Sequence, residues 1–489
     1  MTILTNWIYD FIFFMFFVKK SEFYFFVMFS TFMVLVRSFS TSKYFASFIA
    51  NSYFFAYISI FSGALAKIYF FDSPLINNIL SRNYFFYSDL AIIKTLIIFF
   101  WAILVFFLIT FYYNEYFEKN EFKIFSIDLS LCGALYLVDS SNFVEIFLAL
   151  ELIAFPTYTL ISLGKNKEST EAALVYFMYS VYASLTLVLS FLMLFEYTGQ
   201  SSFFQNIIYT DYTKVEAAGF LFFVTFIVKL GIGPFYYWAP PVYQALSPSA
   251  FIFISTVSKV PLLVVFAYLS KTSFFVSGSW SFFCIIFLLV MGVFMSARDL
   301  ISEKNIRRIM AYTSNINFTV GILGFFFGVF NINSFIIYIG FYLLSNLSVY
   351  IWHLVLNSDF FSKKEITKIE SFQNEDNFSK FIVNTSVIIN SGLPPLTFFF
   401  FKIIIIGNIS FLNPNISFNL LGLFVSIFIL FSSLSSYFAY FNILKSLNYK
   451  ENPITNEIWQ NKKSIYAYIF ANFLTLSTIV FFFKLLFIF

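Results

Sequence analysis

Four charged side chains lie inside long apolar runs of this sequence: Glu151, Lys229, Lys259 and Lys402. An ionisable group in hydrocarbon is costly, so its presence there is by default a sign of function. Three lysines and one glutamate, each well inside its own run, predict a route for protons or cations through a membrane protein. The alternative reading is that the lysines snorkel to water. Snorkelling suits helix ends, whereas Lys229 and Lys259 lie far from the ends of their runs.

Glu151 and Lys229 could act together as a switch. An isolated buried carboxylate would take up a proton, whereas a nearby lysine keeps it charged. Separating such a pair favours release of the lysine proton, and restoring the pair draws a proton in. A static ion pair that only joins two helices is the alternative.

The composition places the chain in a membrane. Hydrophobic residues make up 60% of the 489 residues, and charged residues make up 11%. The mean hydropathy is +0.84. A soluble domain would carry about 25% charged residues. The net charge of +4 gives no indication of nucleic acid as a partner. The 80 phenylalanines, with many Ile, Tyr and Asn residues, have A/T-rich codons and favour a compact organelle genome.

The chain offers few ligands for a cofactor. Its two cysteines, Cys132 and Cys284, lie in separate apolar runs, and His353 is the lone histidine. A zinc or iron–sulfur site needs a cluster of such ligands. No glycine-rich dinucleotide fingerprint follows a candidate strand. We therefore expect no cofactor on this chain, and we expect no removable signal peptide within residues 1–18.

Spanning helices use up most of the length. A span needs about 20 apolar residues. Fourteen candidate spans satisfy this approximately: 22–36, 44–71, 88–112, 124–139, 142–163, 172–196, 217–238, 248–270, 277–297, 306–328, 333–356, 381–408, 417–445 and 464–488. The segment 4–18 is either an interfacial helix or a fifteenth span. Alternate loops then hold 18 lysines and arginines on one side against 5 on the other. The positive-inside rule places the richer side in the cytoplasm or matrix, with both termini opposite.

Two spans carry a glycine–proline interruption next to a lysine. The first reads Lys229-Leu-Gly231-Ile-Gly233-Pro234, and the second reads Ser391-Gly392-Leu-Pro394-Pro395 before Lys402. Proline removes a backbone donor and clashes with the preceding turn. Opened backbone in a membrane is tolerated where it is buried or lines a cavity. Interrupted helices in both halves of one chain indicate an inverted-repeat transporter, with ordinary kinks as the alternative.

Five motifs in order carry a family resemblance, and they extend over about residues 124–410. They are Leu150-Glu151-Leu with Pro156, the run Lys229–Pro240 with Val242-Tyr243, Ser255-Thr256-Val257-Ser258-Lys259, Arg308-Ile-Met-Ala311-Tyr312-Thr313-Ser314, and Gly392-Leu-Pro394-Pro395-Leu396 with Lys402. Together they resemble the antiporter-like subunits of respiratory complex I, NADH:ubiquinone oxidoreductase, and among those the mitochondrial chain 2. Chain 4 of the same complex tends to have glutamate where Lys402 stands.

The sequence departs from the family pattern at four positions. The family often has histidine, aspartate, proline and histidine where this chain has Tyr236, Pro241, Ser258 and Asn317. Tyrosine and asparagine do not take up protons near neutral pH as histidine does. We therefore expect the proton path here to depend more on lysine and water.

The resemblance implies an all-α polytopic membrane fold with about 14 transmembrane helices, broken helices and two five-helix inverted repeats. The expected divisions are N-terminal helices in 1–123, repeats in 124–270 and 277–445, and a matrix loop with a C-terminal helix in 446–489.

It also implies a role in the proton-translocating NADH:ubiquinone reductase of the mitochondrial inner membrane. Glu151 would modulate Lys229, Lys259 would be the central relay and Lys402 the terminal site. FMN, iron–sulfur clusters and ubiquinone would be on partner subunits. The expected partners are chain 4, the small membrane chains next to the quinone site, and lipids. A free-standing cation/proton antiporter, chain 4 itself, and a structural subunit that no longer pumps are the alternatives.

Overall fold

The computed structural model describes residues 142–164, 166–198, 212–269, 280–327, 397–411 and 416–448, with separate positions within 123–140, 335–346 and 388–391. Expectations that fall on 1–122, on His353 and on the second interruption at 392–396 lie outside these residues. The chain divides into two compact units, residues 1–163 and 164–489, and each is described by itself.

In the first unit, α7 (Phe143–Ser162) is an apolar helix of 20 residues. Its buried side is contacted by the segment around Gly133, where an added Cβ would lie 2.8 Å from the backbone nitrogen of Ile153. Farther along, the Ser126 and Thr159 hydroxyls are 2.9 Å apart. Small side chains and hydroxyl pairs of this kind allow close helix packing inside a membrane.

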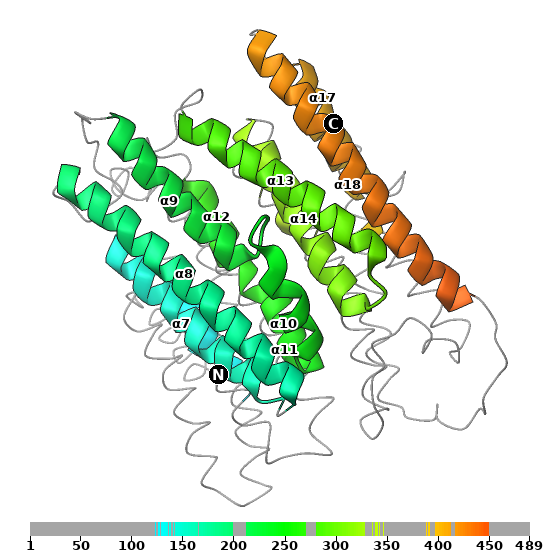
Figure 1. The fold of residues 1–489 in the computed structure, drawn as a ribbon, viewed down its shortest axis with the longest axis horizontal. Coiled ribbons are helices and arrows are strands. Elements are labelled where there is room, and N and C mark those ends of the chain that lie inside the picture. Colours follow the sequence, from blue (N-terminus) through cyan, green and yellow to red (C-terminus); the bar gives the residue numbers. More distant parts are fainter. Residues whose placement is uncertain are drawn as a thin grey trace, which may run out of the picture. The chain divides into compact units, whose positions relative to one another are not determined.

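The second unit holds eleven described elements (Figure 1): α8 (Lys167–Thr198), α9 (Tyr212–Leu230), η1 (Tyr236–Trp238), α10 (Ala239–Ala245), α11 (Pro248–Ile252), η2 (Phe253–Val257), α12 (Lys259–Leu269), α13 (Trp280–Ser302), α14 (Ile306–Phe326), α17 (Thr397–Phe411) and α18 (Ile416–Asn448). Helix α9 packs against α8, α12 and α13, while α10 bridges α8 and α14. Helix α14 also contacts α13, α17 and α18. It is buried along nearly its whole length and forms the centre of this unit.

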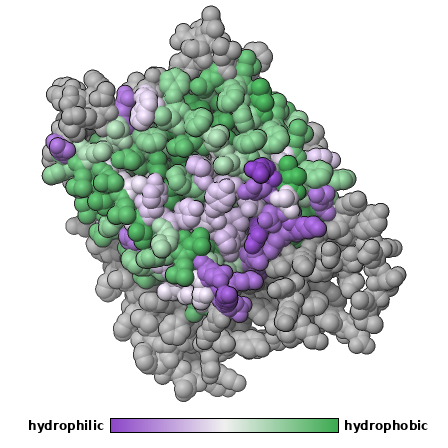
Figure 2. All heavy atoms as spheres, in the orientation of Figure 1, coloured by the Kyte–Doolittle hydropathy of each residue, from purple (hydrophilic) through white to green (hydrophobic). Residues whose placement is uncertain are grey.

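Six of the described helical segments are long and apolar enough to cross a membrane: Phe143–Ser162, Lys167–Glu196, Ala250–Ala267, Trp280–Ser302, Ile306–Phe326 and Leu421–Leu444. Large apolar side chains are exposed along α8, α13 and α18. Figure 2 shows a largely hydrophobic face, with hydrophilic residues gathered where α13 connects to α14. The predicted all-helical membrane fold is confirmed. The total of fourteen spans stays a prediction, because much of the chain lies outside the described residues.

Two predicted span ends were wrong in an informative way. Helix α13 continues to Ser302, five residues beyond the predicted end at 297, and α8 begins at Lys167 instead of 172. Hydropathy ends a span at the first charges, whereas the backbone hydrogen bonds of a helix continue through charged residues. The extension of α13 keeps Asp299 helical, and its carboxylate finds a partner on η1.

Candidate functional site

The helix that carries Lys229 is interrupted where the sequence predicts it. Helix α9 ends at Leu230, Gly231 adopts a left-handed conformation with φ of 68°, and helical structure resumes at Tyr236. A positive φ suits glycine, which has no Cβ to clash with the backbone. This break confirms the prediction for the first interrupted helix.

The freed backbone at the break is satisfied within the protein. The Ile232 N–H donates to the Ile227 carbonyl at 2.9 Å, and the Trp238 indole N–H donates to the Val228 carbonyl at 2.9 Å. Unsatisfied backbone groups are costly in a membrane interior, so these bonds stabilise the opened turn. The indole therefore fixes the second half of the interrupted helix against the end of α9.

Helix α13 approaches the break at backbone contact distance. A Cβ added at Gly233 would lie 1.9 Å from the Cα of Gly292, and a Cβ at Gly292 would lie 2.4 Å from the Cα of Gly233. Only two glycines facing each other permit this approach. The contact fixes the interrupted segment against the first helix of the predicted second repeat.

Lys229 lies between α8 and α9 and is 9% exposed. Its ammonium group donates a hydrogen bond to the Ser180 hydroxyl at 2.9 Å. Farther along the same contact, the Thr186 and Thr225 hydroxyls are 3.1 Å apart. Lys229 is therefore turned toward a hydroxyl-lined contact between two helices.

Lys259 is buried at the start of α12, with 2% exposure. It follows η2, a π-helical turn, and its ammonium group donates to the Ser314 hydroxyl of α14 at 3.3 Å. The same group lies 5.3 Å from the Tyr243 ring centroid and 5.0 Å from that of Phe318. A cation within about 6 Å of an aromatic face is attracted by the ring quadrupole. Two rings and one hydroxyl thus hold the cation without a carboxylate among these contacts.

Lys402 lies on α17 and is 4% exposed. Helix α17 packs against α14 and α18, so the lysine is inside the second unit. The neighbouring Phe401 ring meets Tyr338 edge-on at 5.4 Å, and the Tyr338 hydroxyl donates to the Asn317 carbonyl at 2.9 Å. Through Tyr338, the α17 segment is linked to α14, the same helix that contacts Lys259.

Glu151 lies half-buried on α7 in the first unit, whereas Lys229 belongs to the second. Their pairing therefore stays a prediction. Among the described residues, no three His, Cys, Asp or Glu side chains gather as a metal site would require.

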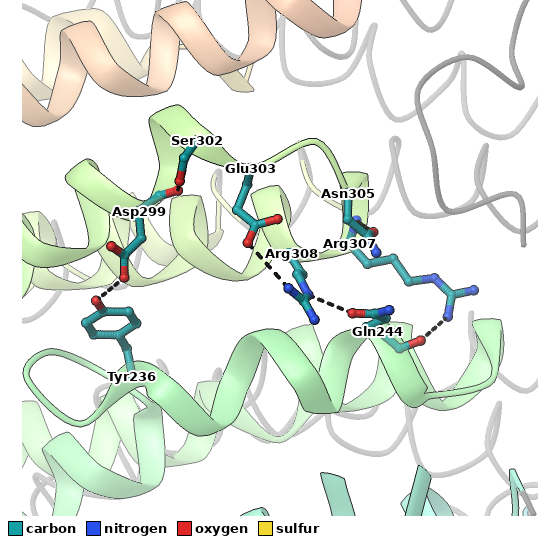
Figure 3. Close-up of polar contacts among 8 residues, drawn as sticks. All are labelled: Tyr236, Gln244, Asp299, Ser302, Glu303, Asn305, Arg307 and Arg308. Carbon is teal, nitrogen blue, oxygen red and sulfur yellow. Dashed lines mark hydrogen bonds and ion pairs between the residues drawn. The ribbon is translucent and has the colours of Figure 1, made fainter. Parts of the chain in front are cut away.

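The structure adds an acidic residue, Asp299, that the sequence does not single out. The hydroxyl of Tyr236, a fully buried residue, donates to Asp299 Oδ2 at 2.5 Å (Figure 3). In the sequence, Tyr236 stands out only as a replacement for histidine, and Asp299 follows the predicted end of its span at 297. The available signal was an acidic residue two positions after an apolar span, within one further turn of helix.

Two arginines join α14 to the C-terminal end of α10. Arg307 donates to the backbone carbonyls of Gln244 at 3.1 Å and Leu246 at 2.6 Å. Arg308 donates to the Gln244 side-chain oxygen at 2.6 Å and lies 3.4 Å from a Glu303 carboxylate oxygen. Figure 3 shows these groups in one row between α10 and the α13–α14 connection.

Comparison with known proteins identifies the family that this chain matches. The family described as "NADH:quinone oxidoreductase/Mrp antiporter, TM" matches residues 140–429, more than half of the chain. The chain belongs to this family. The match to this NADH:quinone oxidoreductase/Mrp antiporter family covers the break, Glu151, and the buried Lys229, Lys259 and Lys402.

Individual relatives agree with this family membership. The chain is 26% identical over 347 residues to "NADH-quinone oxidoreductase subunit N" of Wolbachia sp. subsp. Brugia malayi, covering 68% of this chain and 70% of the relative.

Solved structures share the fold. A chain of respiratory complex I from Thermus thermophilus superposes with a TM-score of 0.67 at 15% identity, covering 93% of this chain and 96% of that one. A chain of the membrane-bound sulfane sulfur reductase, an archaeal respiratory membrane complex, gives a TM-score of 0.72 at 19% identity and covers 94% of each.

Proposed function

We propose that this chain is a proton-translocating membrane subunit of an NADH:quinone oxidoreductase. The observation that carries the proposal is the burial of Lys229, Lys259 and Lys402 within one compact unit of a membrane protein. Two of these lysines adjoin interruptions of regular helix: the break after Leu230 and the π-helical turn before Lys259. Ionisable groups inside a membrane protein mark ion pathways and proton relays.

The four charged residues would then have different roles. Lys229 exchanges its proton beside the break, under the influence of Glu151. Lys259 is the central relay, because its contacts are neutral and leave its charge free to change. Lys402 is the terminal site on α17. The family membership and the relatives named subunit N support this assignment over a purely structural subunit.

Further parts of the proposal rest on the sequence. The codon-biased composition and the resemblance to chain 2 favour the mitochondrial inner membrane, with the lysine-rich loops in the matrix. The two repeats would occupy 124–270 and 277–445. FMN, iron–sulfur clusters and ubiquinone would belong to partner subunits, among them chain 4 and the small membrane chains next to the quinone site.

The proposal is tested by following the native chain in mitochondrial membranes. On a native gel, the chain should migrate with an assembly that oxidises NADH, and NADH oxidation by that assembly in vesicles should acidify one side. A free-standing antiporter would migrate alone and would respond to an imposed cation gradient instead of NADH. Either of those results would overturn the proposal.

The Glu151–Lys229 pair gives a second prediction. Their predicted spans are separated by one span and run in the same direction, and each residue lies about half-way along its own. A charged Glu151 opposes loss of the lysine proton. Glu151→Gln should therefore slow proton pumping, and Glu151→Asp should retain more of it.

The decisive measurement is a double-mutant cycle in the assembled complex. The pair Glu151→Gln with Lys229→Ala should pump no worse than Lys229→Ala alone, because coupled residues have non-additive effects. Additive losses would show that the two residues act separately, and the switch would be excluded.

A further inference from the structure

The Tyr236–Asp299 contact connects the interrupted helix to the polar end of the bundle. Tyr236 is the first helical residue after the break and is fully buried. Asp299 lies one turn before the end of α13 and is partly exposed. The hydrogen bond between them, 2.5 Å long, is short and charge-assisted. One end of this pair can meet water, and the other is enclosed beside the segment that carries Lys229.

The surroundings of the pair are aromatic and charged. The Tyr236 ring stacks on Tyr237 with centroids 4.4 Å apart and meets Tyr312 edge-on at 5.8 Å. The acidic Glu303 lies four residues beyond Asp299, and Arg308 of α14 contacts that glutamate at 3.4 Å. The arginine is thus engaged by Glu303 and by Gln244. The Asp299 carboxylate accepts its hydrogen bond from a neutral hydroxyl, that of Tyr236.

A carboxylate held by a hydroxyl can gain and lose a proton without breaking an ion pair. We propose that Asp299 carries protons at the end of the first interrupted helix that lies near the α13–α14 connection. Tyr236 then passes each proton from Asp299 toward the buried break. This rests on the proposed function of the chain in proton translocation. Asp299 would supply the titratable group that tyrosine at position 236 lacks.

The transfer involves only O–H bonds, with water at both ends. A hydronium ion at the polar end gives a proton to the Asp299 carboxylate, which becomes a carboxylic acid and leaves water. The acid O–H then donates to the Tyr236 oxygen. The tyrosine releases its own hydroxyl proton to a water molecule at the break and accepts the carboxyl proton, which restores the carboxylate. The reverse sequence moves a proton outward.

The central test compares three substitutions at the aspartate and beside it, in the assembled complex. Asp299→Asn keeps the size and a hydrogen-bonding oxygen but cannot carry a proton. It should lower NADH-driven proton pumping by about 100-fold or more, the range for a lost proton-transfer group. Asp299→Glu should recover most of the rate. The matched control is Arg298→Gln, because Arg298 is an exposed charge on the adjacent position and should leave pumping unchanged.

A second arm separates proton transfer from simple tethering. Tyr236→Phe removes the hydroxyl and keeps the ring, and it should lower pumping without further loss when combined with Asp299→Asn. Histidine can itself take up and release a proton near neutral pH. Tyr236→His should therefore restore pumping in the Asp299→Asn background. A purely structural bond would not be rescued by histidine.

The outcomes distinguish this inference from the function on which it rests. If Lys229→Ala stops pumping while Asp299→Asn pumps normally, Asp299 carries no protons and the inference fails alone. If both variants pump normally in an assembled complex, the proposed function fails as well. A third outcome is that Asp299→Asn loses pumping, and that neither Asp299→Glu nor Tyr236→His combined with Asp299→Asn recovers it. This would show that Asp299 is a structural tether and would also overturn the inference.

Discussion

Lys229→Ala is expected to lower NADH-driven proton pumping by about 100-fold or more while the complex still assembles. Proton-transfer groups contribute about 10²–10⁴-fold to rate, and alanine cannot carry a proton. Assembly should persist because the lost hydrogen bond to the Ser180 hydroxyl is a small part of the extensive contact between α8 and α9. Removing a buried ammonium group also removes the cost of keeping it from water. The measurement is proton uptake by vesicles per NADH oxidised, with native-gel staining as the assembly check.

The matched control is Lys167→Ala. Lys167 lies on α8, the helix that carries Ser180, but its side chain is 91% exposed and it pairs with Glu171 at 4.0 Å. Exposed ion pairs contribute about 0–1 kcal/mol to stability. The control should therefore pump normally. Full pumping by assembled Lys229→Ala would exclude Lys229 as a proton carrier.

Gly233→Ala is expected to prevent accumulation of the folded subunit. The new Cβ would lie 1.9 Å from the Cα of Gly292, and neither backbone can move without displacing α13 or the break. Overpacking inside a well-packed structure costs about 1–3 kcal/mol even where side chains can adjust, and here only backbone is available to move. The readout is the amount of assembled complex on a native gel.

Gly407→Ala supplies the matched control for this substitution. Gly407 lies on α17, and an added Cβ there meets no atom within 4 Å. Alanine also favours a helix over glycine by about 1 kcal/mol. Normal assembly of Gly407→Ala beside failed Gly233→Ala would locate the defect in the glycine contact. Normal assembly of both variants would show that the break and α13 separate easily, contrary to the structure.

The helical fold and the first break followed from composition and from local sequence. Long apolar runs fix spans because the bilayer sets their length, and Gly231 and Pro234 stop α9 through backbone geometry alone. The burial of Lys229 could also be predicted, because a lysine in the middle of an apolar run cannot reach water along its own helix. These features depend on a few neighbouring residues.

The residues that contact the lysines could not be predicted from the sequence in the same way. Ser180, Ser314 and Phe318 contact the lysines from other helices, so their roles depend on how the helices pack. Asp299 was missed because a hydropathy rule ended its helix too early. No periodicity in the sequence indicated that Tyr236, 63 positions away, would bond to it.

The π-helical turn before Lys259 sets the direction in which that lysine points. A π turn holds one residue more than an α turn, and each residue of a helix rotates the next by about 100°. Without the extra residue in Phe253–Val257, the helix could continue unbroken, but Lys259 would be turned about a quarter of the way around it. It would then leave Ser314 and the two rings. The direction in which Lys259 points thus depends on the number of residues in this turn. Deleting one residue of the turn would redirect the ammonium group without altering any side chain that contacts it.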